Sequence, residues 1–156
     1  MNIANLTFWY NSELKNRLIG VEQNDDLTPE QRMFTRDTDG GMSLQEVVAK
    51  YKPTMLLGMT GVGGLFKESI VKEMAKHCDR PVIFPLSNPT IKAECTATQA
   101  FEWTNGRCIF ASGSPFDPVT VDGKVFYPTQ CNNSKYKEFS GECPLLEFLC
   151  FSFCFL

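Results

Sequence analysis

Three short segments of this 156-residue chain combine residue types that could bind a polar ligand or carry out catalysis. The first is a glycine-rich stretch from Gly58 to Gly64, directly after an apolar run. The second is Leu86-Ser87-Asn88-Pro89-Thr90, in which an asparagine amide could donate one hydrogen bond and accept another. The third, residues 111–116, holds two serines beside a glycine. Each segment is also typical of a tight turn.

The glycine-rich stretch differs from both common phosphate-binding motifs. Gly61 and Gly63 have the first spacing of GxGxxG, but Phe66 occupies the third glycine position. Gly64 and Leu65 replace the Lys and Ser/Thr of a P-loop. As a strand-to-helix turn, the stretch is predicted to present free backbone N–H groups to a ligand. A purely structural turn remains the alternative.

A serine nucleophile would need an activating base. The chain lacks a GxSxG motif, and its single histidine, His77, is predicted near the end of a helix, where it would favour the helix dipole. This pattern argues against a Ser/His hydrolase. Asn132-Asn133 is a further candidate: the paired amides could bind a polar ligand or belong to a simple loop.

Composition excludes several classes of function. The net charge of −3 gives no electrostatic footprint for nucleic acid. No apolar run reaches the roughly 18 residues of a spanning helix, so no membrane partner is expected. The seven cysteines include no CxxC pair, and with one histidine they offer little to a zinc site. Buried reduced thiols are ordinary in a reducing compartment, so we expect an intracellular protein.

The elements that must position these segments alternate along the middle of the chain. Capping boxes begin helices after Ser43 and after Thr96, and a stripe of Phe66, Ile70, Met74 and Cys78 predicts a third helix between them. Apolar runs at 54–57, 81–86 and 108–111 predict buried strands. The order predicts an α/β fold, with a Rossmann-like partial parallel sheet and flanking helices. A β-hairpin is predicted over 119–127.

The chain divides into three segments. Residues 1–40 are weakly patterned, with a helix-start signature at Thr28-Pro29-Glu30-Gln31. Residues 41–133 hold the alternating elements. Residues 134–156 form a different, apolar tail: from Pro144 onward, four phenylalanines, four leucines and two cysteines accompany a single charge. In an open α/β sheet ligands bind past the carboxyl ends of the strands, and both the glycine-rich stretch and Leu86–Thr90 are expected there.

The candidate segments, taken together, closely resemble one family. The stretch from Lys52 to Asn133 resembles the carboxyl-terminal part of the nucleotide-binding domain of malic enzymes. Its most specific residues are LSNPT at 86–90, KAECT at 92–96 and FASGSPFDPV at 110–119, followed by Asn132-Asn133. On this basis residues 41–133 are identified as a partial NAD(P)-binding domain, and ligand contact is favoured over a simple turn.

The resemblance implies a function and a set of contacts. Malic enzymes oxidise malate with NAD or NADP and decarboxylate it to pyruvate with help from Mg²⁺ or Mn²⁺. The cofactor-binding residues implied here are Met59, Thr60, Gly61, Leu86, Ser87 and Asn88. The substrate-binding residues implied are Asn88, Asn132 and Asn133.

Several family features have no match in this sequence. The acid–base lysine and tyrosine, the malate-binding arginine and the metal-binding carboxylates are missing, so we assign no catalytic residue and no metal ligand. We therefore expect a truncated product that does not catalyse the family reaction alone. The alternative is a non-catalytic fragment that binds a dinucleotide or pairs with full-length malic enzyme subunits. The absence of a transit peptide favours the cytoplasm over mitochondria as its location.

Overall fold

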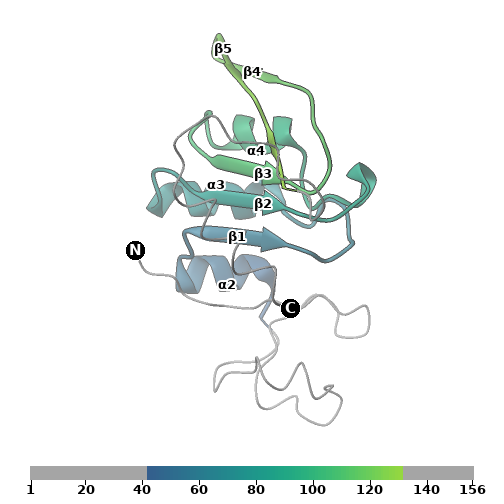
Figure 1. The fold of residues 1–156 in the computed structure, drawn as a ribbon. Helices are drawn as coiled ribbons and strands as arrows, with labels where there is room; N and C mark the ends of the chain where they lie inside the picture. Colours follow the sequence, from purple (N-terminus) through teal and green to yellow (C-terminus); the bar gives the residue numbers. More distant parts are fainter. Residues whose placement is uncertain (1–41, 132–156) are drawn as a thin grey trace.

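The computed structural model describes residues 42–131, and within them it confirms the expected α/β architecture. A parallel sheet has the strand order β1-β2-β3-β6, and a separate antiparallel hairpin pairs β4 with β5 (Figure 1). The strands of the sheet are β1 (Met55–Gly58), β2 (Val82–Pro85), β3 (Ile109–Ser112) and β6 (Thr129–Gln130). The helices are α2 (Leu44–Tyr51), α3 (Glu68–His77) and α4 (Ala97–Trp103), with a short 3₁₀ turn, η2 (Thr90–Lys92). The helix start expected at Thr28 lies outside the described residues.

Both capping boxes form as predicted. At the start of α2, Ser43 Oγ accepts a hydrogen bond from the N–H of Glu46, whose carboxylate accepts one from the N–H of Ser43. Thr96 and Gln99 make the same reciprocal pair at the start of α4. These contacts satisfy N–H groups that a helix leaves unpaired, so each helix begins where its cap stands.

The three helices cover one face of the sheet. Their buried side chains form a core with the inward residues of the strands and with Phe66, and the predicted stripe supplies Ile70 and Met74. The opposite face carries a second apolar cluster, to which none of the three helices contributes a side chain. Its buried members are Val82, Phe84 and Ala111. Parallel strands with apolar side chains on both faces are typical of a sheet that is buried on both sides.

The hairpin lies against α4, above the sheet in the view of Figure 1. It consists of β4 (Val119–Val121) and β5 (Lys124–Phe126), and both residues of its turn, Asp122 and Gly123, have a positive φ. Such a turn matches the twist of the paired strands, as the Asp-Gly pair predicts. The Phe126 ring stacks on Phe101 of α4 with 4.8 Å between the ring centroids.

The strand β6 was not predicted from the sequence. It is two residues long, and its pairing with β3 places Thr129 beside Ala111 and Gln130 beside Ser112. A pair of polar residues has no alternating or apolar pattern, so only the tertiary pairing identifies it as a strand. This strand brings the end of the described chain to the same edge of the sheet as the candidate segments.

Candidate functional site

The carboxyl ends of the strands lie level with one another. Gly58 pairs with Pro85 in the register of β1 and β2, and the N–H of Gly113 donates to Pro85 O at 3.1 Å. The N–H of Cys131 extends the ladder by donating to Ser112 O at 2.8 Å. The segments 59–61, 86–88 and 112–114 therefore lie at or just beyond the carboxyl ends of the strands, at a single edge. We call these three segments the rim.

A carboxylate that sequence reasoning did not single out joins two segments of the rim. The side chain of Glu94 is fully buried, and its Oε1 accepts three hydrogen bonds. The donors are the N–H of Thr60 at 2.8 Å, the Thr60 hydroxyl at 2.8 Å and the Ser87 hydroxyl at 2.6 Å. Its Oε2 accepts a longer bond from the N–H of Ser87, at 3.5 Å. A buried acceptor of this kind holds both loops in one conformation.

The Ser87 hydroxyl extends this network to the glycine-rich loop. It donates to Glu94 and accepts from the N–H of Gly61 at 2.9 Å. The Thr60 hydroxyl likewise accepts from the N–H of Val62 at 3.1 Å, and the N–H of Gly64 donates to Ala93 O at 3.1 Å. The expectation of free N–H groups in this loop is thus wrong for Thr60, Gly61, Val62 and Gly64. The sequence could not show it, because the acceptors are brought to the loop by the tertiary fold.

Contacts and backbone conformation within the chain explain why glycine occupies these positions of the loop. A methyl group at position 58 would overlap the Glu94 side chain, and one at position 63 would overlap the backbone carbonyl of Ile91. Gly61 and Gly64 have φ values of +71° and +72°, which favour glycine. The glycine content alone therefore does not indicate a ligand site. Evidence for such a site has to come from the exposed atoms of the rim.

Asn88 links the second segment of the rim to the third. Its Oδ1 accepts a hydrogen bond of 2.6 Å from the hydroxyl of buried Ser114, and its Nδ2 makes a 3.4 Å bond to Leu86 O. A methyl group at position 113 would overlap Leu86 O, so the third segment packs directly on the second. The Asn88–Pro89 peptide bond is cis. Asn88 remains exposed, and the Met59 side chain beside the glycine loop is 62% exposed.

The serines of residues 112–114 have structural partners, which agrees with the argument against a hydrolase. The Ser112 hydroxyl donates to Ser114 O at 2.8 Å. His77 is in the last turn of α3, and its Nε2 lies 3.2 Å from Pro53 O. Because Pro53 precedes β1, while Ser112 ends β3 and the strands are parallel, the histidine and the serines occupy opposite edges of the sheet.

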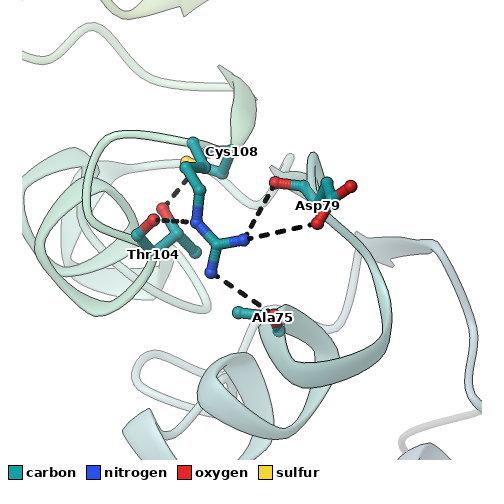
Figure 2. A network of polar contacts seen from close by, with 5 residues as sticks. Ala75, Asp79, Thr104 and Cys108 are labelled. Atoms are coloured by element: carbon teal, nitrogen blue, oxygen red, sulfur yellow. Dashed lines mark hydrogen bonds and ion pairs between the residues drawn. The ribbon is translucent and has the colours of Figure 1, made fainter.

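The opposite, amino-terminal edge has its own polar network (Figure 2). Arg107 donates from Nε to Thr104 O, from Nη1 to Asp79 O and from Nη2 to Ala75 O, at 3.2–3.3 Å. The Thr104 hydroxyl, which is fully buried, donates to Ala100 O and accepts from the N–H of Cys108. A cation beside the last carbonyls of α3 and α4 is the arrangement that the helix dipole favours.

The remaining titratable groups of the described residues give no metal site and no activated nucleophile. Residues 42–131 contain no group of three or more His, Cys, Asp or Glu side chains that could hold a metal ion. Burial raises the pKa of the Cys95 thiol, and it raises that of Cys108 to about 11 despite an opposing hydrogen bond from Thr104. Both thiols are free and protonated at neutral pH. Over the same range, no helix is long and apolar enough to span a bilayer.

The rim thus unites most of the residues named from the sequence. Met59, Thr60 and Gly61 lie in its first segment, and Leu86, Ser87 and Asn88 in its second. Asn132 and Asn133 lie outside the described residues. Glu94 was not singled out from the sequence, and Ser114 was considered there only as a possible nucleophile, not as a partner of Asn88. Glu94 could have been suspected because a carboxylate between two apolar residues, in Ala-Glu-Cys, predicts a buried charge that needs partners.

Comparison with known proteins gives one consistent result. The sequence profile of a family described as "Malic enzyme, NAD binding domain" matches residues 15–136. This range begins within the segment 1–40 and is longer than the resemblance seen from Lys52 to Asn133.

Individual relatives are likewise named malic enzymes. An NADP-dependent malic enzyme of Dictyostelium discoideum is 48% identical over 83% of this chain, and an NAD-dependent malic enzyme of Shewanella woodyi is 50% identical over 62%. A hydrogenosomal malic enzyme of Neocallimastix frontalis is 50% identical over 70% of the chain. The matched residues span only 24%, 17% and 19% of these relatives, respectively.

Proposed function

We propose a function that proceeds from one premise: this chain belongs to the malic enzyme family. The rim is proposed to bind NAD or NADP through Met59, Thr60 and Gly61 on the first loop and Leu86, Ser87 and Asn88 on the second. The observation that carries the proposal is the 2.9 Å hydrogen bond from Gly61 N to Ser87 Oγ, which joins the two loops at the carboxyl edge of a parallel sheet. This edge is where open α/β sheets bind ligands.

The exposed atoms of the rim suit a neutral, partly apolar portion of the dinucleotide. Four N–H groups of the glycine loop are bonded inside the chain, so they are not available to a phosphate. Met59 offers an exposed apolar surface, and Asn88 offers an amide whose Nδ2 makes only one long hydrogen bond within residues 42–131. A planar aromatic amide such as nicotinamide matches this combination, and when bound it supplies the acceptor for a hydride.

Malate is proposed to bind beside the cofactor, through Asn88, Asn132 and Asn133. Support comes from Cys131, the last described residue, whose N–H is bonded to the carboxyl end of β3. Asn132 follows it directly in the sequence. Amide side chains can donate to a carboxylate without adding charge to the site.

We infer that the chain binds without turning malate over. The family reaction is oxidative decarboxylation of malate to pyruvate with a divalent metal, and no residue here matches the family's acid–base pair or metal ligands. Residues 41–133 are accordingly proposed to supply part of an NAD(P)-binding domain, with residues 134–156 as a tail that departs from the family.

The test is a fluorescence titration of the full chain with NADPH and with NADH. Asn88→Ala is expected to weaken binding about tenfold, the cost of one lost hydrogen bond to a polar ligand. Gln45→Ala is the matched control, because it removes another exposed amide, on α2, which accepts a hydrogen bond from the Ser69 hydroxyl. Saturable binding that is equally strong in both variants would remove Asn88 from the site. Absence of binding to either dinucleotide would overturn the proposal.

A second candidate is pairing with a full-length malic enzyme subunit. It is favoured by the apolar cluster on the sheet face away from the helices, whose members Met55, Leu57 and Ile109 are only partly buried. Co-expression with a tagged full-length malic enzyme, followed by purification of the tag, should recover this chain in a stable complex. Recovery of the tagged enzyme alone would reject the pairing.

A further inference from the structure

One buried carboxylate remains without a role in the proposed function. Glu94 is fully buried, and its side-chain hydrogen bonds run to two residues, Thr60 and Ser87, one on each cofactor-facing loop. Within residues 42–131 no salt-bridge partner is found for it, so the hydrogen-bond donors of the rim compensate its burial. Burying a carboxylate is costly unless its acceptors are satisfied.

The surrounding chain is built to place this carboxylate under the loops. Gly58 ends β1 without a side chain, and the Glu94 side chain occupies the space that a Cβ would fill. The Glu94 backbone carbonyl accepts the N–H of Phe66, and the neighbouring Ala93 carbonyl accepts that of Gly64. The glycine loop thus forms hydrogen bonds both to the Glu94 side chain and to the backbone of residues 93–94.

We propose that Glu94 is a positioning residue for dinucleotide binding. It binds Thr60 directly and Gly61 through the Ser87 hydroxyl. These hydrogen bonds fix the position of the two loops relative to each other before the ligand binds. The inference rests on the proposed function for its ligand, but the positioning itself is a property of the free protein. A pre-ordered rim lowers the entropy that binding must otherwise remove.

The first experiment measures amide hydrogen exchange of the full chain without ligand. Glu94→Gln keeps one side-chain oxygen for the donors that meet Oε1, but it loses the charge and places N–H donors toward the N–H of Ser87. Protection of the Thr60 and Gly61 amides is expected to fall about tenfold. Glu94→Ala should lower the protection of these amides further. Glu94→Gln should therefore retain part of the protection that Glu94→Ala loses.

Two further variants separate positioning from general stability. Ser87→Ala breaks only the bridge, so Gly61 should lose protection while Thr60 keeps its bond to Glu94. Thr104→Val removes a buried, hydrogen-bonded hydroxyl at the opposite edge, and it should leave the rim amides as protected as in the native chain. If Glu94→Ala fails to fold, Glu94→Gln and Ser87→Ala still decide the question.

The second experiment measures dissociation constants for NADP and NAD in the same variants. Glu94→Gln is expected to weaken binding about tenfold, and Thr104→Val by less than about twofold. Unchanged rim exchange in Glu94→Gln, or an equal change in Thr104→Val, would overturn the positioning role. Failure of the native chain to bind either dinucleotide would overturn the proposed function instead, and the exchange data would then decide the role of Glu94 alone.

Discussion

One charged side chain holds separate segments together at each edge of the sheet. At the carboxyl edge this residue is Glu94, and at the amino edge it is Arg107. Glu94 is fully buried and accepts from Thr60 and Ser87, which belong to exposed loops. The Arg107 side chain is 41% exposed and donates to backbone carbonyls at the ends of α3 and α4. The buried charge orders loops at the proposed binding rim, whereas the exposed charge closes helix ends.

Each charge is also followed by a buried thiol, Cys95 after Glu94 and Cys108 after Arg107. The two edges therefore share a local pattern and differ in what they position. From this difference we expect substitutions at the carboxyl edge to alter both stability and binding, and substitutions at the amino edge to alter stability alone.

The largest effect is expected for Glu94→Ala. The substitution leaves the N–H of Thr60 and the hydroxyls of Thr60 and Ser87 without their acceptor, and a cavity remains beside Gly58. We expect the free energy of unfolding to fall by about 3 kcal/mol or more, measured by urea denaturation of the full chain. A loss below about 1 kcal/mol would show that the loops find other partners.

Thr104→Val should have the next largest effect. Its hydroxyl is fully buried, donates to Ala100 O at 2.7 Å and accepts from the N–H of Cys108. Valine has the same shape without the hydroxyl, so we expect a loss of about 1–2 kcal/mol in the free energy of unfolding. A change in dinucleotide affinity in Thr104→Val would contradict the expectation that the amino edge affects stability alone.

Arg107→Ala is expected to cost less, about 1 kcal/mol, because its hydrogen bonds lie in contact with solvent. Its ion pair with Asp79 is long, at 4.0 Å, and Asp79 is fully exposed. The loss should therefore be similar at low and high salt, which thermal denaturation at two ionic strengths would measure. A strong salt dependence would mean that the ion pair, and not the carbonyl contacts, holds this edge.

The smallest effect at neutral pH involves Cys108. Burial raises its pKa from 9.0 to about 11, so the folded chain keeps a proton that the unfolded chain loses. The resulting stability is fully present below about pH 9 and is lost as the pH rises toward 11. Denaturation of the native chain and of Cys108→Ala between pH 7 and 11 should show a shallower decline in the variant. Parallel declines would assign the pH dependence to other groups.

Local signals in the sequence were sufficient for most of the fold. The Ser43 and Thr96 capping boxes, the stripe through Ile70 and Met74, and the Asp122-Gly123 turn each depend on residues close in the chain, and all are confirmed. The strand β6 could not be predicted because it exists only through its pairing with β3.

The candidate site was predictable to a lesser degree. The order of strands and helices was enough to place the loops of Gly61 and Asn88 at one edge, since parallel strands end together. The bonds inside that edge were not predictable. Glu94 is 34 residues from Thr60 in the sequence, and only the folded chain shows that its carboxylate uses the donors that the glycine loop was expected to leave free.

The most direct test of the account is an NMR titration of the full chain with NADP and, separately, with NAD, following each backbone amide. We predict that the signals of residues 59–61 and 86–88 shift together with one dissociation constant, while those of Asp79 and Arg107 at the amino edge stay in place. Shifts confined to the amino edge, or no shift at saturating concentrations of either dinucleotide, would contradict a binding role for the rim.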